Sequence, residues 1–314
     1  MHPGYAGLEL GVGLFFLAAA VAALRRGRLP FLELVSAAAF GVLLEEGDQL
    51  IFGTYHYSAD WIVVVDRAPV AIGLTWALIL AGAMRITDAL GVRRRLAPVV
   101  DAVLAISLDL AFDAVAIRMG LWTWRGVGPS DGWFGVPAGN FYAWLFVALG
   151  FSLVSRWLRD ASRGRPALEW LQLAVPLPAF GLLLAGLLPF VWLKPLTDDA
   201  PGGGLHLFAV AFAVFCALAV RATRGPNRMP PDGQRTAILD LRLAFASRLA
   251  IHLLFLVALL VLGVHREAPM LLAVALALLA AEAPLAVLVN RRLEGAGLGP
   301  AVERAGAAAP ARYR

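Results

Sequence analysis

The sequence lacks most of the residues and motifs on which metal and redox enzymes depend. Cysteine occurs once in 314 residues, at Cys216, which excludes an internal disulfide and a cysteine-ligated metal cluster. His56 follows several carboxylates in the chain but has no second histidine at ligand spacing. The glycine run 202–204 lacks the lysine and the helix start of a phosphate-binding loop. We therefore expect neither a metal ion nor a dinucleotide or flavin cofactor.

Charged residues are also scarce, and long apolar segments take their place. Charged residues make up 16% of the chain and hydrophobic residues 60%, with a mean hydropathy of +0.76. Apolar runs of about 20 residues, the length needed to cross a bilayer, recur from end to end. We expect an all-α, polytopic membrane protein with nine spans, or with eight because the last two form a tight hairpin. The expected spans are 8–24, 31–52, 69–86, 98–119, 141–157, 168–192, 205–221, 241–264 and 270–289.

Arginine clusters fall on alternate loops between these spans. They lie at residues 25–28, 93–95, 156–165, 224–235 and 291–292. The positive-inside rule places these loops in the cytoplasm, so we expect a multi-pass protein of the cell membrane with an outer N-terminus and a cytoplasmic C-terminus. The first span follows no lysine or arginine and is expected to be an anchor, not a cleaved signal. Anionic lipid headgroups account for the net charge of +5, so no nucleic-acid partner is expected.

Composition divides the chain into four parts. A transmembrane domain, 1–222, precedes a cytoplasmic linker, 223–236, that is rich in glycine, proline and arginine. A C-terminal transmembrane hairpin occupies 237–290, where Arg248, His252 and Glu282 are expected to hold the two helices together. The tail, 291–314, is rich in alanine, glycine and arginine and is expected to be disordered.

Two carboxylates lie four residues apart in the fourth expected span. Asp109 and Asp113 share one helical face, with Asp109 near mid-membrane and Asp113 one turn closer to the outside. A carboxylate at this depth costs about 2.5–3.5 kcal/mol on insertion scales, so we expect the two to have a function. The alternative is that they pair with Arg118 or with hydroxyl groups as links between helices.

Other polar residues are expected at the depth of Asp113. Glu45, Glu46 and Asp48 end the second span, and Asn140 begins the fifth. Adjacent helical residues point about 100° apart, so only one of the two glutamates can face a given cavity. Asp48 is expected in water, and Asn140 has the alternative role of an N-cap. The inner halves of the second, fourth and fifth spans, by contrast, are expected to be nearly bare of polar residues.

Aromatic residues lie close in the chain to these polar residues, both before and after them. Each of Trp122, Trp124, Trp133 and Trp144, and also the segment 55–57, fits an interfacial aromatic belt when considered alone. Arg118, near a helix end, fits a snorkelling or counter-ion role. Taken together with the carboxylates, these residues predict an acidic site inside an aromatic cavity that opens to lipid.

Two segments resemble known proteins. Residues 113–124 read Asp-Ala-Val-Ala-Ile-Arg-Met-Gly-Leu-Trp-Thr-Trp, and 133–144 read Trp-Phe-Gly-Val-Pro-Ala-Gly-Asn-Phe-Tyr-Ala-Trp. They resemble the carotenoid biosynthesis membrane proteins of the carotenoid 1,2-hydratase type, typified by the cyanobacterial and archaeal carotenoid hydratases. A looser match covers 45–47 and 53–57, so the resemblance spans about the middle third of the chain. Ala114 replaces a proline and Ala143 a glycine of that pattern, which leaves a different end-group preference open.

The resemblance implies an acyclic carotenoid substrate and acid-catalysed addition of water to its terminal double bond. An apolar cavity favours the neutral form of a carboxyl group, and a second carboxylate favours it further, so a protonated acid at neutral pH is feasible. We assign Asp113 as the acid and Asp109 as its coupled partner, without resolving their order. Glu45 or Glu46 is the expected water-orienting base. The expected substrate-binding residues are Trp122, Trp124, Phe134, Asn140, Trp144 and Arg118.

The expected partners are the acyclic carotenoid, water and membrane lipid, with other carotenoid biosynthesis enzymes as further candidates. An end-group cyclase is the closest alternative, because it starts from the same protonation but excludes water. A transporter or proton-coupled carrier would use Asp109, Asp113 and Glu45 along a path that crosses the midplane. The expected bare inner halves and the absence of an internal repeat both argue against it. A protein that binds carotenoid without changing it is the remaining alternative.

Overall fold

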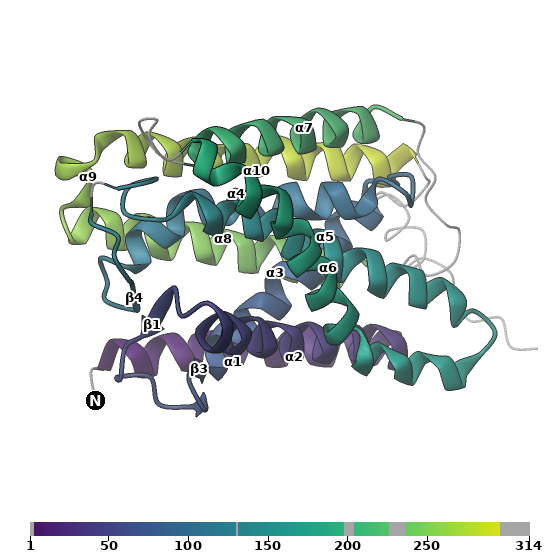
Figure 1. Cartoon of the computed structure of the whole chain (residues 1–314). Coiled ribbons are helices and arrows are strands. Elements are labelled where there is room, and N and C mark those ends of the chain that lie inside the picture. Colours follow the sequence, from purple (N-terminus) through teal and green to yellow (C-terminus); the bar gives the residue numbers. More distant parts are fainter. Residues whose placement is uncertain (1–2, 130, 198–203, 226–236, 296–314) are drawn as a thin grey trace, which may run out of the picture.

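Long helices make up almost all of the protein. The computed structural model describes residues 3–129, 131–197, 204–225 and 237–295. The long helices in these ranges are α1 (Pro3–Arg26), α2 (Arg28–Ile51), α3 (Val70–Ala89), α4 (Ala97–Ala116), α5 (Ala138–Ala161), α6 (Pro176–Leu193), α7 (Leu205–Thr223), α8 (Ala237–Val261) and α10 (Pro269–Gly295). They lie alongside one another in a bundle (Figure 1).

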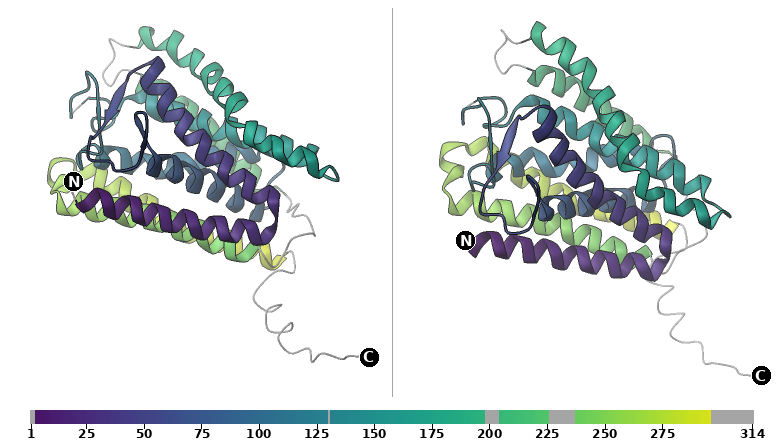
Figure 2. Two further views of the ribbon diagram at one scale, coloured as in Figure 1. Left: turned by 90° about the horizontal axis from the view of Figure 1, so that it is seen from below. Right: turned by 60° about the horizontal axis from the view of Figure 1, so that its bottom comes forward.

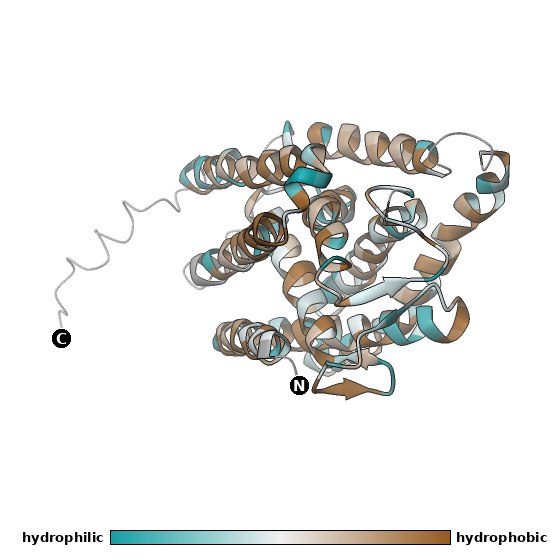
Figure 3. Ribbon diagram, turned by 90° about the vertical axis from the view of Figure 1, so that its left-hand side faces the viewer, coloured by the Kyte–Doolittle hydropathy of each residue, from teal (hydrophilic) through white to brown (hydrophobic). Residues whose placement is uncertain are grey.

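The bundle has the composition of a membrane protein. Seven of the described helices are long and apolar enough to cross a membrane. α2 and α4 have similar lengths but carry several acidic residues, and they lie among the seven. Most of the helix length is hydrophobic when the bundle is viewed end-on (Figure 3). The expected all-α polytopic membrane fold is therefore confirmed.

The helix boundaries follow the expected spans, with two differences. The sixth span is not one continuous helix, because the 3-10 helix η1 (Pro166–Ala174) precedes α6. A second 3-10 segment, η2 (Lys194–Leu196), follows α6. Helix α10 continues to Gly295, which is beyond the expected start of a disordered tail. The expected linker residues 226–236 and the remainder of the tail lie outside the described residues.

Helix α4 lies at the centre of the bundle and carries the expected acidic pair. It packs against α3, α5, α7, α8 and α10, and sixteen of its twenty residues are buried. Helices α8 and α10 are therefore part of the same bundle. Figure 2 shows α1 running beside α8, with α6 at the opposite edge.

Two glycines bring α2 close to α3 beside this centre. A Cβ atom at Gly41 would lie 2.6 Å from the Trp76 Cβ and 2.9 Å from the Gly73 Cα. Small residues at helix interfaces let two backbones approach closely within a membrane. Glu45 follows Gly41 by one helical turn and therefore lies against the same face of α3.

Short strands cover one end of the bundle, which we call the strand end. It carries β1 (Tyr55–Tyr57), β2 (Val64–Val65), β3 (Ala68–Pro69), β4 (Trp122–Trp124) and α9 (Val264–Glu267). β1 and β4 are antiparallel, with Tyr55 opposite Trp124 and Tyr57 opposite Trp122. The N-terminus lies at this end as well (Figure 1). The opposite end, where α1 and α5 finish, is called the arginine end.

Candidate functional site

Asp109 and Asp113 form a buried acid pair on α4. Their exposed fractions are 0% and 3%, and they lie one helical turn apart on the same face of α4. Burial and a neighbouring carboxylate both oppose ionisation of a carboxyl group. The surroundings of the pair therefore favour retention of a proton. Asp109 Oδ1 accepts no hydrogen bond from a donor in the described part of the chain.

Asn140 bridges the acid pair from α5. Its Nδ2 donates to Asp109 Oδ2 at 3.1 Å and to Asp113 Oδ2 at 2.6 Å. Pro137 is the N-cap of α5, so the alternative that Asn140 is only an N-cap is wrong. The amide has two N–H groups and donates one to each carboxyl group, which fixes the position of the pair relative to α5.

No cation neutralises the acid pair among the described residues. Arg118, the expected alternative partner, donates to the Ala114 O at 2.7 Å and to the Phe134 O at 2.9 Å. It thus ties the end of α4 to the following loop, which is a structural role. The structure brings Arg118 near this loop but not into contact with the carboxyl groups.

Glu45 lies next to the acid pair and accepts hydrogen bonds from three aromatic side chains. Its Oε2 accepts from the Tyr55 and Tyr57 hydroxyls, the latter at 2.5 Å, and its Oε1 accepts from Trp76 Nε1 at 2.7 Å. Glu45 is 5% exposed and interacts electrostatically with both aspartates. Three donors offset the cost of burying this carboxyl group.

The two tyrosines remain hydrogen-bond donors in this setting. Burial, followed by the neighbouring Glu45 carboxylate, raises the pKa of both Tyr55 and Tyr57 well above the usual range. Their assignment to an interfacial belt is therefore wrong, since their hydroxyls point to a buried carboxyl group. The looser motif at 53–57 contained a usable signal, because alternate residues of a strand share one face.

Glu46 and Asp48 lie apart from the acid pair. Glu46 Oε1 accepts from the backbone N–H groups of Arg67 at 2.7 Å and Ala68 at 2.6 Å, and so holds the loop before α3. Asp48 Oδ2 accepts from the Thr54 hydroxyl at 2.5 Å. Of the adjacent glutamates, only Glu45 faces the site.

Aromatic rings pack on one another around Glu45. Trp144 packs on Trp76 with centroids 4.1 Å apart and on Phe112 at 5.5 Å. The other close ring pairs are Phe112 with Trp122 and with Phe255, Tyr57 with Trp122 and with Trp61, and Tyr55 with Trp124. We call these nine residues the aromatic cage. Trp122, Trp124 and Trp144 are buried in it, so the belt alternative is wrong for them.

Sequence reasoning missed Trp76, Phe112, Trp61 and Phe255 as members of the aromatic cage. These residues carry no motif, and nothing in their spacing marks them. Phe134, expected around the substrate, lies instead in a tight turn closed by the Trp133–Val136 backbone pair. Its φ is +52°, which is rare for a bulky residue, and its ring contacts Trp133.

A cavity of about 550 Å³ opens at the strand end, and we call it the mouth. It is lined by Gln49, Tyr55, His56, Tyr57, Ser58, Ala59, Trp61, Val64, Asp66, Arg67 and Arg125. Tyr55 and Tyr57 therefore contact the mouth on one side and Glu45 on the other. No cluster of metal-ligating side chains occurs within the described ranges.

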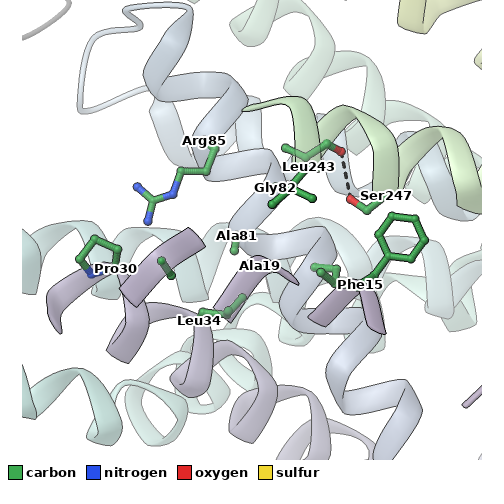
Figure 4. A pocket seen from close by; sticks show the side chains of 12 residues that line it. Phe15, Ala19, Pro30, Leu34, Ala81, Gly82, Arg85, Leu243 and Ser247 are labelled. Atoms are coloured by element: carbon green, nitrogen blue, oxygen red, sulfur yellow. Dashed lines mark hydrogen bonds between the residues drawn. The ribbon is translucent and has the colours of Figure 1, made fainter. Parts of the chain in front are cut away.

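A second hollow lies between α1, α2, α3 and α8 (Figure 4). Its lining is mostly apolar, and it includes Phe15, Leu34 and Leu243. Arg85 carries the one charge among its described lining residues and already contacts Glu33 Oε2 at 3.0 Å. This hollow shares no lining residue with the mouth or the aromatic cage.

The arginine end contains a charge network that the sequence did not suggest. Arg156 contacts Asp101 at 2.9 Å and also pairs with Asp88, while Arg159 contacts Glu33 at 2.6 Å and Asp88 at 2.8 Å. These residues come from α2, α3, α4 and α5, and Arg85 completes the set. The expectation that the inner halves of these spans are nearly bare of polar residues is therefore wrong. The network is hard to recognise in the sequence because each helix carries only one or two of its residues.

The last two long helices are joined by a third polar cluster. Arg248 contacts Glu282 at 2.6 Å, and His252 lies 3.1 Å from the same carboxylate. Arg248 also donates to the Leu104 O at 2.7 Å, so the cluster connects α8 and α10 to α4. The expected role in holding the hairpin together thus extends to the centre of the bundle.

Comparison with known proteins gives one match. A family model described as carotenoid biosynthesis protein matches residues 10–194, which is more than half of the chain. The matched segment includes the acid pair, Asn140, Glu45 and both tyrosines of β1. No curated protein and no solved structure matches the chain.

Proposed function

The chain belongs to the carotenoid biosynthesis protein family, and from this membership we propose that it is a cofactor-free hydratase of acyclic carotenoids. It adds water across the terminal carbon–carbon double bond and leaves a tertiary alcohol. The observation that carries the proposal is a buried acid pair that contacts no cation among the described residues and lies near the aromatic cage around Glu45. A buried acid that keeps its proton can donate it.

The first step is protonation of the alkene. The O–H bond of the acid pair breaks, the π electrons of the terminal double bond form a C–H bond, and a tertiary carbocation remains. Aromatic faces attract a cation through their quadrupole, so Trp144, Trp122 and Phe112 stabilise this charge without forming a bond to it. Asp113 is the better donor, because it is one turn closer than Asp109 to the aromatic residues at the strand end.

The second step is capture of the cation by water. A water molecule beside Glu45 forms the C–O bond, and the proton that it loses passes to a carboxylate of the site. Atoms balance as alkene plus water gives alcohol, and no oxidant or reductant is required. Glu45 suits the base because Glu46 is committed to the backbone of the loop before α3.

We further propose that the strand end faces the outside and the arginine end the cytoplasm, in the cell membrane. The arginines on alternate loops support this orientation. A forty-carbon polyene is about as long as the ~30 Å hydrocarbon core is thick. A substrate that lies along the bilayer normal can therefore place one end in the aromatic cage while its body stays in lipid.

The test is the origin of the new oxygen atom. Membranes that contain the protein are supplied with an acyclic carotenoid in oxygen-18 water, without nicotinamide, flavin or metal. We expect a tertiary alcohol with one heavy oxygen, measured by mass spectrometry. A cyclic product of unchanged mass would replace the proposal with the end-group cyclase, and recovery of unmodified pigment from several acyclic substrates would replace it with a carrier.

A further inference from the structure

Two tyrosine side chains lie between the mouth and Glu45. Tyr55 and Tyr57 line the mouth, and each donates its hydroxyl hydrogen to the same oxygen of Glu45, Oε2. Trp76 occupies the other oxygen, Oε1. The three donors to the Glu45 carboxyl group in the described part of the chain are therefore aromatic side chains, and two of them also line the mouth.

The mouth has the polar lining that water requires. Gln49, Ser58, His56 and Asp66 all contribute polar atoms, together with two arginines. Ordered water in proteins makes about three hydrogen bonds to such groups. The aromatic cage on the other side is apolar apart from its few N–H and O–H groups. Water is thus available up to the tyrosines but has few partners beyond them.

Each tyrosine hydroxyl retains acceptor capacity after it donates to Glu45. A phenolic oxygen has lone pairs that accept a hydrogen bond while its O–H donates. One water molecule can therefore donate to a tyrosine oxygen as it moves from the mouth toward Glu45. Without the hydroxyl, a ring of the same shape offers this water no partner.

We propose that Tyr55 and Tyr57 are positioning residues that admit one water from the mouth to Glu45 and so decide between hydration and water-free products. This inference rests on the proposed function, because it concerns the fate of the cation formed there. When water is present, the cation gains a C–O bond and the water loses a proton to a carboxylate. When water is absent, the cation loses a proton from a neighbouring carbon to that carboxylate, with or without ring closure. The water-free products have the mass of the substrate.

The experiment measures how product divides between alcohol and isomers of unchanged mass. Tyr55→Phe, Tyr57→Phe and the double variant keep both rings and remove only the hydroxyls. We expect the ratio of alcohol to unchanged-mass products to fall at least tenfold in the double variant, in membranes supplied with one acyclic carotenoid. The total amount of substrate consumed should fall by a smaller factor than the ratio of alcohol to unchanged-mass products. Tyr142→Phe is the matched control, because Tyr142 of α5 packs on Phe146 of the same helix and on Phe190 of α6 and does not contact Glu45.

The outcomes separate this inference from the proposed function. A wild-type protein that forms no alcohol from any acyclic carotenoid would end the proposed function. Wild-type hydration with an unchanged product ratio in the double variant would end the inference alone. An equal loss of all products would also overturn it, since that is the result of a merely structural role for the two hydroxyls. An altered ratio in Tyr142→Phe would count against it too, because that hydroxyl lies away from Glu45.

Discussion

The acid pair and the arginine-end network solve the same physical problem in opposite ways. Asp109, Asp113 and Glu45 lie inside the bundle and contact no cation in the described ranges. Glu33, Asp88 and Asp101, by contrast, pair with Arg85, Arg156 and Arg159. A buried carboxyl group is stabilised when it keeps a proton, when it faces an opposite charge, or when it accepts several hydrogen bonds as Glu45 does. The first solution leaves a proton that can react, and the second leaves a set of charges that hold helices together.

The two regions therefore have different roles in one bundle: we propose that the acid pair is catalytic, whereas the arginine-end network holds helices together. Polar residues on both sides of the midplane would favour a transporter if they formed one path. The arginine-end residues instead satisfy one another in ion pairs across four helices. A buried carboxylate is therefore a candidate catalyst only after its partners have been identified. Depth in the membrane does not distinguish the two kinds.

The largest effect is expected from breaking the network at its centre. Arg156→Met leaves Asp101 and Asp88 without their shared partner, and removal of one member of a buried ion pair costs about 3–5 kcal/mol. We expect a correspondingly lower resistance to unfolding in detergent, followed by helical circular dichroism. Arg163→Met is the matched control, because the Arg163 side chain is 73% exposed and contacts only Asp160 among the described residues. A melting profile of Arg156→Met equal to that of the control would contradict the structural role.

Removing the acid should affect turnover and not folding. Asp113→Asn and Asp109→Asn keep the side-chain shape but remove the proton donor, so we expect turnover to fall by about 10²-fold or more. Resistance to unfolding should stay much closer to wild type than in Arg156→Met. Glu46→Gln is the matched control, because its amide oxygen can still accept from the Arg67 and Ala68 N–H groups. Wild-type turnover in both aspartate variants would remove the central claim.

A cation added to the acid pair should make it resemble the arginine end. Asn140→Lys places an ammonium where the amide now contacts both carboxyl groups. An adjacent positive charge favours the ionised form of both acids, so no proton remains for the alkene. We expect turnover to fall at neutral pH and to recover partly as the pH is lowered and the pair regains its proton. A pH profile parallel to that of wild type would show that the missing cation is not what distinguishes the two regions.

The sequence by itself determined the membrane class, the number and approximate limits of the long helices and the placement of Asp109 and Asp113 on one face of α4. These features follow from apolar length and from the 3.6-residue period, which act along a single helix. It also identified Glu45 and Asn140 as candidates at one depth. The choice of Glu45 over Glu46 was left open, because both occupy the last turns of α2.

Only the tertiary structure decided which groups these residues meet. The rotation of α5 about its axis directs Asn140 to the acid pair, and the close approach of α2 and α3 at Gly41 and Gly73 directs Trp76 to Glu45. The same rotations bring Arg156 to Asp101 from helices that carry few charges each. Hydropathy and motif spacing are properties of one segment, whereas ion pairs, shared protons and ring contacts depend on how several helices are turned toward one another.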